Sequence, residues 1–305
     1  MIPSLCDTMV RAQTPAAIRN TIVTMASRRQ SLDDPAREEL RVTYSLLAVD
    51  SAAGLIGVAT ASRSLAVGNA VPAIDPAVGA VASQAWTNRG LRAQALDALA
   101  AGLSPAEVVA QVPTWDDGAP LRQLAVLDIR GRGAHVTGAR CTGWAGGRDF
   151  PGTVAIGNLL ADGGVLDAMC ESFTESSARP PARGRHALET FAARLLAALV
   201  AGERAGGDAR GRESAAVQVA RVAEHRQWPP ELAVDLRSDH DPEPLERLAE
   251  LLALRFAGGV ESAATDVAAA TPVPSWRQTS SGVTAPRTTV TPSDALAHQC
   301  GVEQP

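Results

Sequence analysis

The chain contains no lysine, because all 28 of its basic residues are arginine. This absence excludes a Schiff-base lysine, a phosphate-binding P-loop lysine and a lysine general base. Aromatic residues make up 3% of the 305 residues, so a core must be built mainly from alanine, valine and leucine. No apolar run reaches the length of a membrane-spanning helix, which disfavours a transmembrane helix.

The charge and the cysteine content narrow the possible classes of protein further. The formal net charge is -5, and no basic cluster is interleaved with aromatics, which disfavours nucleic-acid binding. Cys6, Cys141, Cys170 and Cys300 include no Cys-x-x-Cys pair, so we expect reduced thiols rather than a zinc site or a disulfide framework. The first twenty residues lack the continuous apolar stretch of a signal peptide, which favours a cytoplasmic location.

Composition divides the chain into three parts. Residues 1–42 have mixed polarity and end in a charged segment, so they read as a leader, either a propeptide or the product of a misassigned start. Residues 43–256 carry ordered hydrophobic patterns and form the expected domain. Residues 257–305 are rich in Ser, Thr, Pro, Ala and Gly and predict a disordered tail.

Within the domain, strands and helices come in groups. Ser104, Pro105 and Glu107 are typical of a capped helix start, and Leu188 and Phe191 begin the apolar stripe of a later helix. We expect strands over 43–50, 54–62, 77–86, 123–138 (a hairpin), 154–158, 214–222 and 233–238, and helices over 90–102, 104–112, 165–173, 186–202 and from Asp241 onward. This grouping disfavours a parallel βαβ sheet. Two packed antiparallel sheets with helices outside both, a four-layer αββα sandwich of the α+β class, satisfy the pattern and explain strands that are apolar on both faces.

Thr43 opens the first strand and is the first candidate for chemistry. A free N-terminal threonine joins a hydroxyl nucleophile to an α-amine whose reference pKa is roughly 7.7–8, so the neutral amine can accept the hydroxyl proton. Such a mechanism needs neither histidine nor lysine. The alternative is structural, since β-branched threonine is common in strands.

Four stretches together resemble one bacterial family. They are TYSLLAVDSAAGLIGVATASRSLAVG, SQAWTN, GGDARGRESAAV and VDLRSDHDPEPL, and they lie within residues 43–256. The family is DUF1028, a family of unknown function with an Ntn-hydrolase (N-terminal nucleophile) fold. The resemblance implies the αββα sandwich and a nucleophile at Thr43. Members of the family typically begin Met-Thr, so that removal of the methionine exposes the threonine.

This chain departs from that pattern because Val42 precedes Thr43. Three explanations stay open. Autoproteolysis between Val42 and Thr43 frees the threonine, or the leader persists and blocks the site, or the gene start is misassigned. In the third case Val42 corresponds to a GTG start codon, and the product begins Met-Thr-Tyr-Ser. The GC-rich codons of the abundant arginine, alanine, glycine and proline favour that explanation.

Residues after the second and third strands complete the candidate site. Ser62 and Arg63 follow the second strand, which as a hairpin partner comes near Thr43. In related Ntn folds a lysine near the nucleophile lowers the amine pKa, and the resemblance implies Arg63 as its counterpart. The alternative is a surface or salt-bridged arginine. Gly68 and Asn69 lie in a turn that approaches closely, with Asn69 as a polar contact. The amides Gln84 and Asn88 lie at a strand end before a helix, and Asn158 ends a later strand. All three suit an oxyanion or a substrate amide, although Thr87 or Asn88 also suits helix capping.

A charged cluster is predicted between two late segments. Asp208, Arg210 and Arg212 precede a strand and can pair with Asp239 or His240, as a structural ion-pair corner, a contact for a charged substrate or a dimer contact. A metal site is disfavoured there, because Asp241 is better used as a helix N-cap.

The resulting hypothesis is an amidohydrolase of a small amide or peptide-like compound. Thr43 is its nucleophile, its own amine the base and Arg63 the group that tunes the amine. No cofactor is expected, and the Ntn resemblance suggests a homodimer. The rival hypothesis is a non-catalytic binding or scaffold protein that keeps the fold.

Overall fold

The computed structural model describes residues 43–178, 186–207 and 212–257. The predicted leader and nearly all of the predicted tail lie outside these residues. Within the described ranges, no helix combines the length and the apolar character needed to cross a bilayer.

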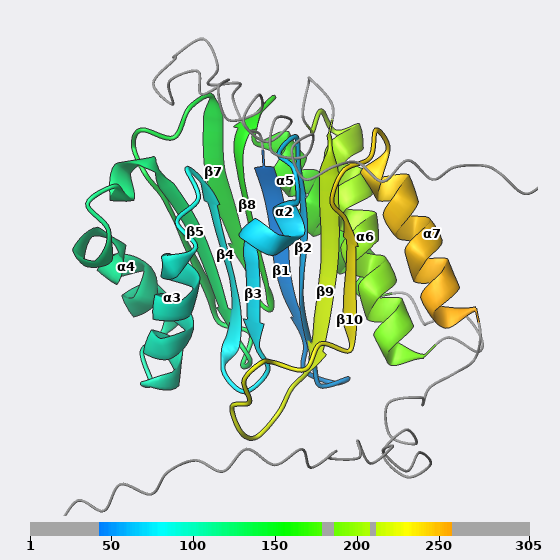
Figure 1. Ribbon diagram of the computed structural model, residues 1–305, viewed down its shortest axis with the longest axis horizontal. Helices are drawn as coiled ribbons and strands as arrows, with labels where there is room; N and C mark the ends of the chain where they lie inside the picture. Colours follow the sequence, from blue (N-terminus) through cyan, green and yellow to red (C-terminus); the bar gives the residue numbers. More distant parts are fainter. Residues whose placement is uncertain (1–42, 179–185, 208–211, 258–305) are drawn as a thin grey trace, which may run out of the picture. The chain divides into compact units, whose positions relative to one another are not determined.

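Two antiparallel sheets form the centre of the structure (Figure 1). The larger sheet consists, in spatial order, of β10 (Val234–Ser238), β9 (Ser214–Arg221), β2 (Leu55–Ser62), β1 (Thr43–Asp50), β8 (Thr153–Leu160) and β7 (Trp144–Phe150). The smaller sheet consists of β3 (Pro72–Asp75), β4 (Gly79–Ala85), β5 (Arg122–Asp128) and β6 (Gly133–Thr137). The strand β1 is therefore central and has hydrogen-bonded neighbours on both sides.

Helices cover the outer face of each sheet. The larger sheet packs against α5 (Gly164–Ala178), α6 (Ala187–Arg204) and α7 (Pro244–Phe256), and the smaller against α3 (Gly90–Ala100) and α4 (Pro105–Trp115). A short helix, α2 (Val67–Ala70), and a 3-10 turn, η2 (Ala119–Leu121), lie in the connections. The predicted αββα sandwich is confirmed.

Side-chain alternation along β1 divides the core into layers. Tyr44, Leu46 and Ala48 point to the helices of the larger sheet, whereas Leu47 and Val49 point between the sheets, because successive strand residues face opposite sides. Each fully buried leucine contributes about 1.5–3 kcal/mol to folding. The same alternation places Thr43 and Ser45 in the layer between the sheets.

The strongly patterned elements agree with the sequence prediction. The capping box of α4 forms as expected from Ser104 and Glu107. The stripe of α6 is buried at Leu188, Phe191 and the leucines that follow. The central hairpin forms as β1 and β2 in full register.

Several element predictions need correction. The last helix begins at Pro244 rather than Asp241, whose Oδ1 accepts the N–H of Glu243 in the turn before the helix. The strands β3 and β7 were not predicted, since one contains a proline and the other has a Gly146–Gly147 pair followed by charges, which breaks the apolar alternation. The predicted turn at Gly68 is the helix α2.

The expected close approach at Gly68 is present. A Cβ added there lies 2.5 Å from the Cβ of Ala216 and 2.9 Å from Cδ of Arg237, so only glycine lets α2 pack this tightly on β9 and β10.

Candidate functional site

Thr43 is the first residue of β1 and is 5% exposed. Its register partners are Ser62 on β2 and Asn158 on β8. The Oγ1 atom of Thr43 lies 3.0 Å from the Oγ atom of Ser62, and either hydroxyl can donate. The Oγ atom of Ser62 also accepts the backbone N–H of Ser64 at 3.0 Å, which holds the serine hydroxyl toward Thr43.

Two side-chain amides hold the carbonyl oxygen of Thr43. Gln84 donates to it from Nε2 at 3.0 Å, and Asn158 donates from Nδ2 at 3.4 Å. Gln84 comes from β4 of the smaller sheet and Asn158 from β8 of the larger one, so the start of β1 is bound from both sheets.

A polar layer continues behind Thr43. We use this term for seven buried side chains: Thr43, Ser45, Thr60, Ser62, Gln84, Gln123 and Asn158. Ser45 Oγ lies 2.7 Å from Gln84 Oε1 and 2.8 Å from Thr60 Oγ1. The layer continues the space between the sheets that holds an apolar cluster further along, since Thr43 and Ser45 are followed on the same face by Leu47.

The polar layer is made of hydroxyls and amides alone. In residues 43–178, 186–207 and 212–257, Thr43 has no hydrogen bond to a titratable side chain. A hydroxyl in these surroundings can be oriented by its neighbours, but none of the seven side chains can act as a general base at neutral pH.

The start of β1 is also held on its other face, which is turned toward the helices of the larger sheet. Tyr44, the only tyrosine of the chain, donates from its hydroxyl to Glu203 Oε2 at 2.7 Å. Glu203 also binds Arg212, which further contacts Glu243 and Glu246 at the start of α7. The terminal residues of a strand normally fray. Here the contacts of Thr43 on one face of β1 and of Tyr44 on the other hold the strand end in place.

This cluster corrects the predicted charge pairing. Arg212 pairs with glutamates at the end of α6 and the start of α7 instead of with Asp239 or His240, because their carboxylates lie within 3.2 Å of its guanidinium. His240 is exposed and contacts Glu213 at 2.9 Å, while the backbone carbonyl of Asp239 accepts the N–H of Ala66. Asp208 and Arg210 lie outside the described residues.

The remaining predicted residues divide between the site and its surroundings. Arg63 is half-buried and directly follows Ser62. Asn69 is exposed on α2, and its side chain makes no hydrogen bond to the described residues, although its backbone carbonyl accepts from Arg92.

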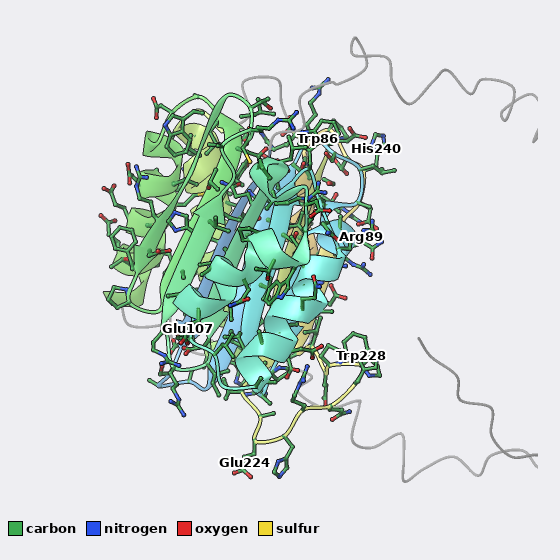
Figure 2. All side chains as sticks on the ribbon, turned by 90° about the vertical axis from the view of Figure 1, so that its left-hand side faces the viewer. Trp86, Arg89, Glu107, Glu224, Trp228 and His240 are labelled. Carbon is green, nitrogen blue, oxygen red and sulfur yellow. The ribbon has the colours of Figure 1, made fainter. Side chains whose placement is uncertain are left out.

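Figure 2 places Trp86, which follows β4, at the same end of the sandwich as His240, with Trp228 at the opposite end.

Asn88 belongs to a structural corner. It donates from Nδ2 to Asp116 at 2.7 Å and accepts the N–H of Gly90 at 2.9 Å. Asp116 also binds Arg122 Nε at 2.7 Å. The hydrogen bonds from Arg122, first, and then from Asn88 lower the pKa of Asp116 to about 2. Asn88 therefore braces the turn before α3 and does not cap the helix, because the N-cap residue is Arg89 and it makes no side-chain cap hydrogen bond.

Sequence reasoning missed Ser45, Thr60 and Gln123. Ser45 and Thr60 stand two positions from Thr43 and Ser62 in the same strands, and Gln123 is the second residue of β5. That two-residue spacing puts polar pairs on one face and was the available signal.

Comparisons with known proteins agree over most of the chain. The model of a family of unknown function, DUF1028, matches residues 43–248. The crystal structure of protein SPO2555 from Silicibacter pomeroyi, a protein of the same family model, is 34% identical. It aligns with a TM-score of 0.60 over 76% of this chain and 95% of that one. No curated protein matches.

Proposed function

We propose, from the premise that this chain belongs to the DUF1028 family of unknown function, that it is an amidohydrolase whose nucleophile is Thr43. Its substrate class is a small amide or peptide-like compound, and its own α-amine is the base. The proposal takes the fold to be of the Ntn-hydrolase type.

The placement of Thr43 carries the proposal. Thr43 is the first residue of a central strand, it is buried, and its Oγ1 lies 3.0 Å from Ser62 Oγ. Hydrogen bonds from both sheets fix its carbonyl, so the hydroxyl and the nitrogen of the same residue have defined directions. Such pre-positioning is what a nucleophile requires.

The base must come from Thr43 itself, because its described partners are neutral amides and hydroxyls. In the proposed reaction Oγ1 bonds to the substrate carbonyl carbon while its proton passes to the neutral amine. The resulting ammonium returns that proton to the leaving nitrogen as the C–N bond breaks. Water then adds to the ester, the amine again carries the proton, and the carboxylic acid leaves with Thr43 restored.

Two neighbours have supporting roles in this reaction. Ser62 orients the hydroxyl of Thr43 through the 3.0 Å contact. Arg63, next to Ser62, supplies positive charge that favours the neutral form of the amine without itself acting as a base.

The reaction requires that Thr43 be freed from Val42. Autoproteolysis produces a chain that begins at Thr43, and a start at Val42 does so once the initiator methionine has been removed. Intact-mass measurement of the protein from its native host identifies the terminus. We expect a chain that begins at Thr43, and a chain that retains the leader contradicts the proposal.

Covalent labelling tests the nucleophile directly. We expect a β-lactone to add its mass to Thr43 in the wild type and in Thr43→Ser, and not in Thr43→Ala. Thr114→Ala removes an exposed hydroxyl of α4 and serves as the matched control, which we expect to be labelled as the wild type is. Equal labelling of wild type and Thr43→Ala contradicts the proposal and favours the binding or scaffold alternative.

The cytoplasmic location and the homodimer belong to the same proposal. Fractionation of native cells and light scattering of the purified chain test them separately.

A further inference from the structure

Gln123 lies at the centre of the polar layer without touching Thr43. It is the second residue of β5 and is fully buried. Its Nε2 donates to Thr137 Oγ1 at 2.8 Å and to the backbone carbonyls of Gly146 and Gly157 at 3.0 and 2.9 Å. Its Oε1 accepts from Gln84 at 2.8 Å and from Asn158 at 3.3 Å.

The two glycine carbonyls fix the direction of this network. A backbone carbonyl oxygen can only accept, so the NH₂ group of Gln123 must face Gly146 and Gly157. Its oxygen consequently faces Gln84 and Asn158, and each of those must present its own NH₂ group. Both NH₂ groups then reach the carbonyl of Thr43 as well.

The backbone after each amide shows that this arrangement is maintained against local strain. Ala85 directly follows Gln84 and has a φ of 65°, and Leu159 directly follows Asn158 and has a φ of 57°. Left-handed backbone is unfavourable for residues other than glycine and persists where the surroundings impose it.

Leu159 is also the extra residue of a β-bulge. In the register of β7 and β8, Ala145 pairs with Asn158 and Trp144 with Leu160, which leaves Leu159 unpaired. Bulges re-aim neighbouring side chains. Both strained residues therefore adjoin the two side chains that bind Thr43.

We infer that Gln123 is a positioning residue, whose amide holds the NH₂ groups of Gln84 and Asn158 on the Thr43 carbonyl and thereby fixes the direction of the nucleophile. This role rests on the proposed function of Thr43. It predicts that Gln123 affects the reactivity of Thr43 at a distance of two hydrogen bonds.

The test is the rate of β-lactone labelling at Thr43, measured per folded chain with a free Thr43 terminus. Gln123→Met keeps the side-chain length and removes every hydrogen bond of the amide. We expect the labelling rate to fall by between about tenfold and about a hundredfold, as misplacement of a reacting group does. We also expect the pH profile of the labelling rate to shift, since Thr43, which carries the amine, is no longer held through its carbonyl oxygen.

Gln218→Met is the matched control. Gln218 is a buried glutamine of β9 that donates to Asp235 at 3.0 Å, outside the polar layer. We expect it to change stability without changing the labelling rate. If Gln123→Met does not fold, Gln123→Asn replaces it, because it keeps the amide but withdraws it from Gln84 by one methylene.

A double-variant cycle tests the route. If Gln123 acts through Gln84 and Asn158, the loss in Gln84→Met/Gln123→Met is smaller than the product of the single losses. The positioning role is overturned if the loss of labelling rate in the double variant equals the product of the two single losses, or if labelling is unchanged in both Gln123 variants. Neither result overturns the proposed function of Thr43. Absence of labelling in the wild type overturns the proposed function and this role with it.

Discussion

The hydroxyl of Tyr44 donates a 2.7 Å hydrogen bond to Glu203, which lies 159 residues further along the chain. This bond ties the start of β1 to the end of α6, on the face opposite to the hydroxyl of Thr43. The first strand is thus held through its backbone, through the polar layer and through the helices.

Loss of this bond should destabilise the fold. We expect Tyr44→Phe to lower the free energy of unfolding by about 1–3 kcal/mol, because the carboxylate loses a buried donor. Urea denaturation measures the change. In the double variant with Glu203→Gln the two effects should not add, and full additivity contradicts the pairing.

Acid should weaken the corner at Asp116. The pKa of Asp116 is lowered from 3.8 to about 2 in the folded protein, so the carboxylate stabilises the fold above pH 3.8 and that contribution disappears as the pH falls toward 2. We expect Asp116→Asn to be less stable than the wild type at neutral pH and the difference to shrink in this range. The control is Asp117→Asn at the exposed neighbouring position, which should be as stable as the wild type at neutral pH.

Glycine should have opposite effects at two positions of β4. Ala85 has a left-handed backbone, so Ala85→Gly relieves strain and should raise the free energy of unfolding by up to about 1 kcal/mol. Ala82 lies in ordinary buried strand, and Ala82→Gly should lower it by about 0.5–1 kcal/mol or more. Denaturation midpoints of the two variants measure these changes. If both variants are less stable than the wild type, or both more stable, there is no strain at Ala85.

Labelling of Thr43 should depend on pH through its amine. A protonated amine cannot accept the hydroxyl proton, so the rate should rise about tenfold per pH unit below the amine pKa and then level off. The reference pKa for an α-amine is roughly 7.7–8, and the charge of Arg63 should move the midpoint lower. A rate independent of pH between about 5 and about 9 contradicts the amine as base.

The sequence predicted the parts of the fold whose signal is local. The stripe of α6, the capping box of α4 and the hairpin of β1 and β2 depend on spacing and on neighbouring residues. The edge strand β7 escaped prediction because its glycines and charges give no alternation. Its conformation is set by pairing with β8, which depends on tertiary structure.

In the candidate site, too, the residues with a local sequence signal were predicted and those placed by tertiary structure were not. Ser62 was predicted beside Thr43 because a hairpin brings the two together. Gln123 could not be assigned, since its role depends on the packing of one sheet on the other and on the carbonyls of two glycines. The partners of Arg212 were mispredicted for a related reason, because helix ends that are remote in sequence supply them.

Because the polar layer carries no net charge, its contacts should respond to ionic strength differently from those of the charged cluster around Arg212. Dissolved ions screen net charges, and they act most strongly on exposed ones. Glu243 and Glu246 are 62% and 63% exposed, so concentrated salt weakens their contact with Arg212. The amides and hydroxyls around Thr43 carry dipoles without net charge and are buried, so salt leaves them nearly unchanged. At high salt the link from Arg212 to the start of α7 should therefore weaken, while the polar layer that holds Thr43 should keep its geometry.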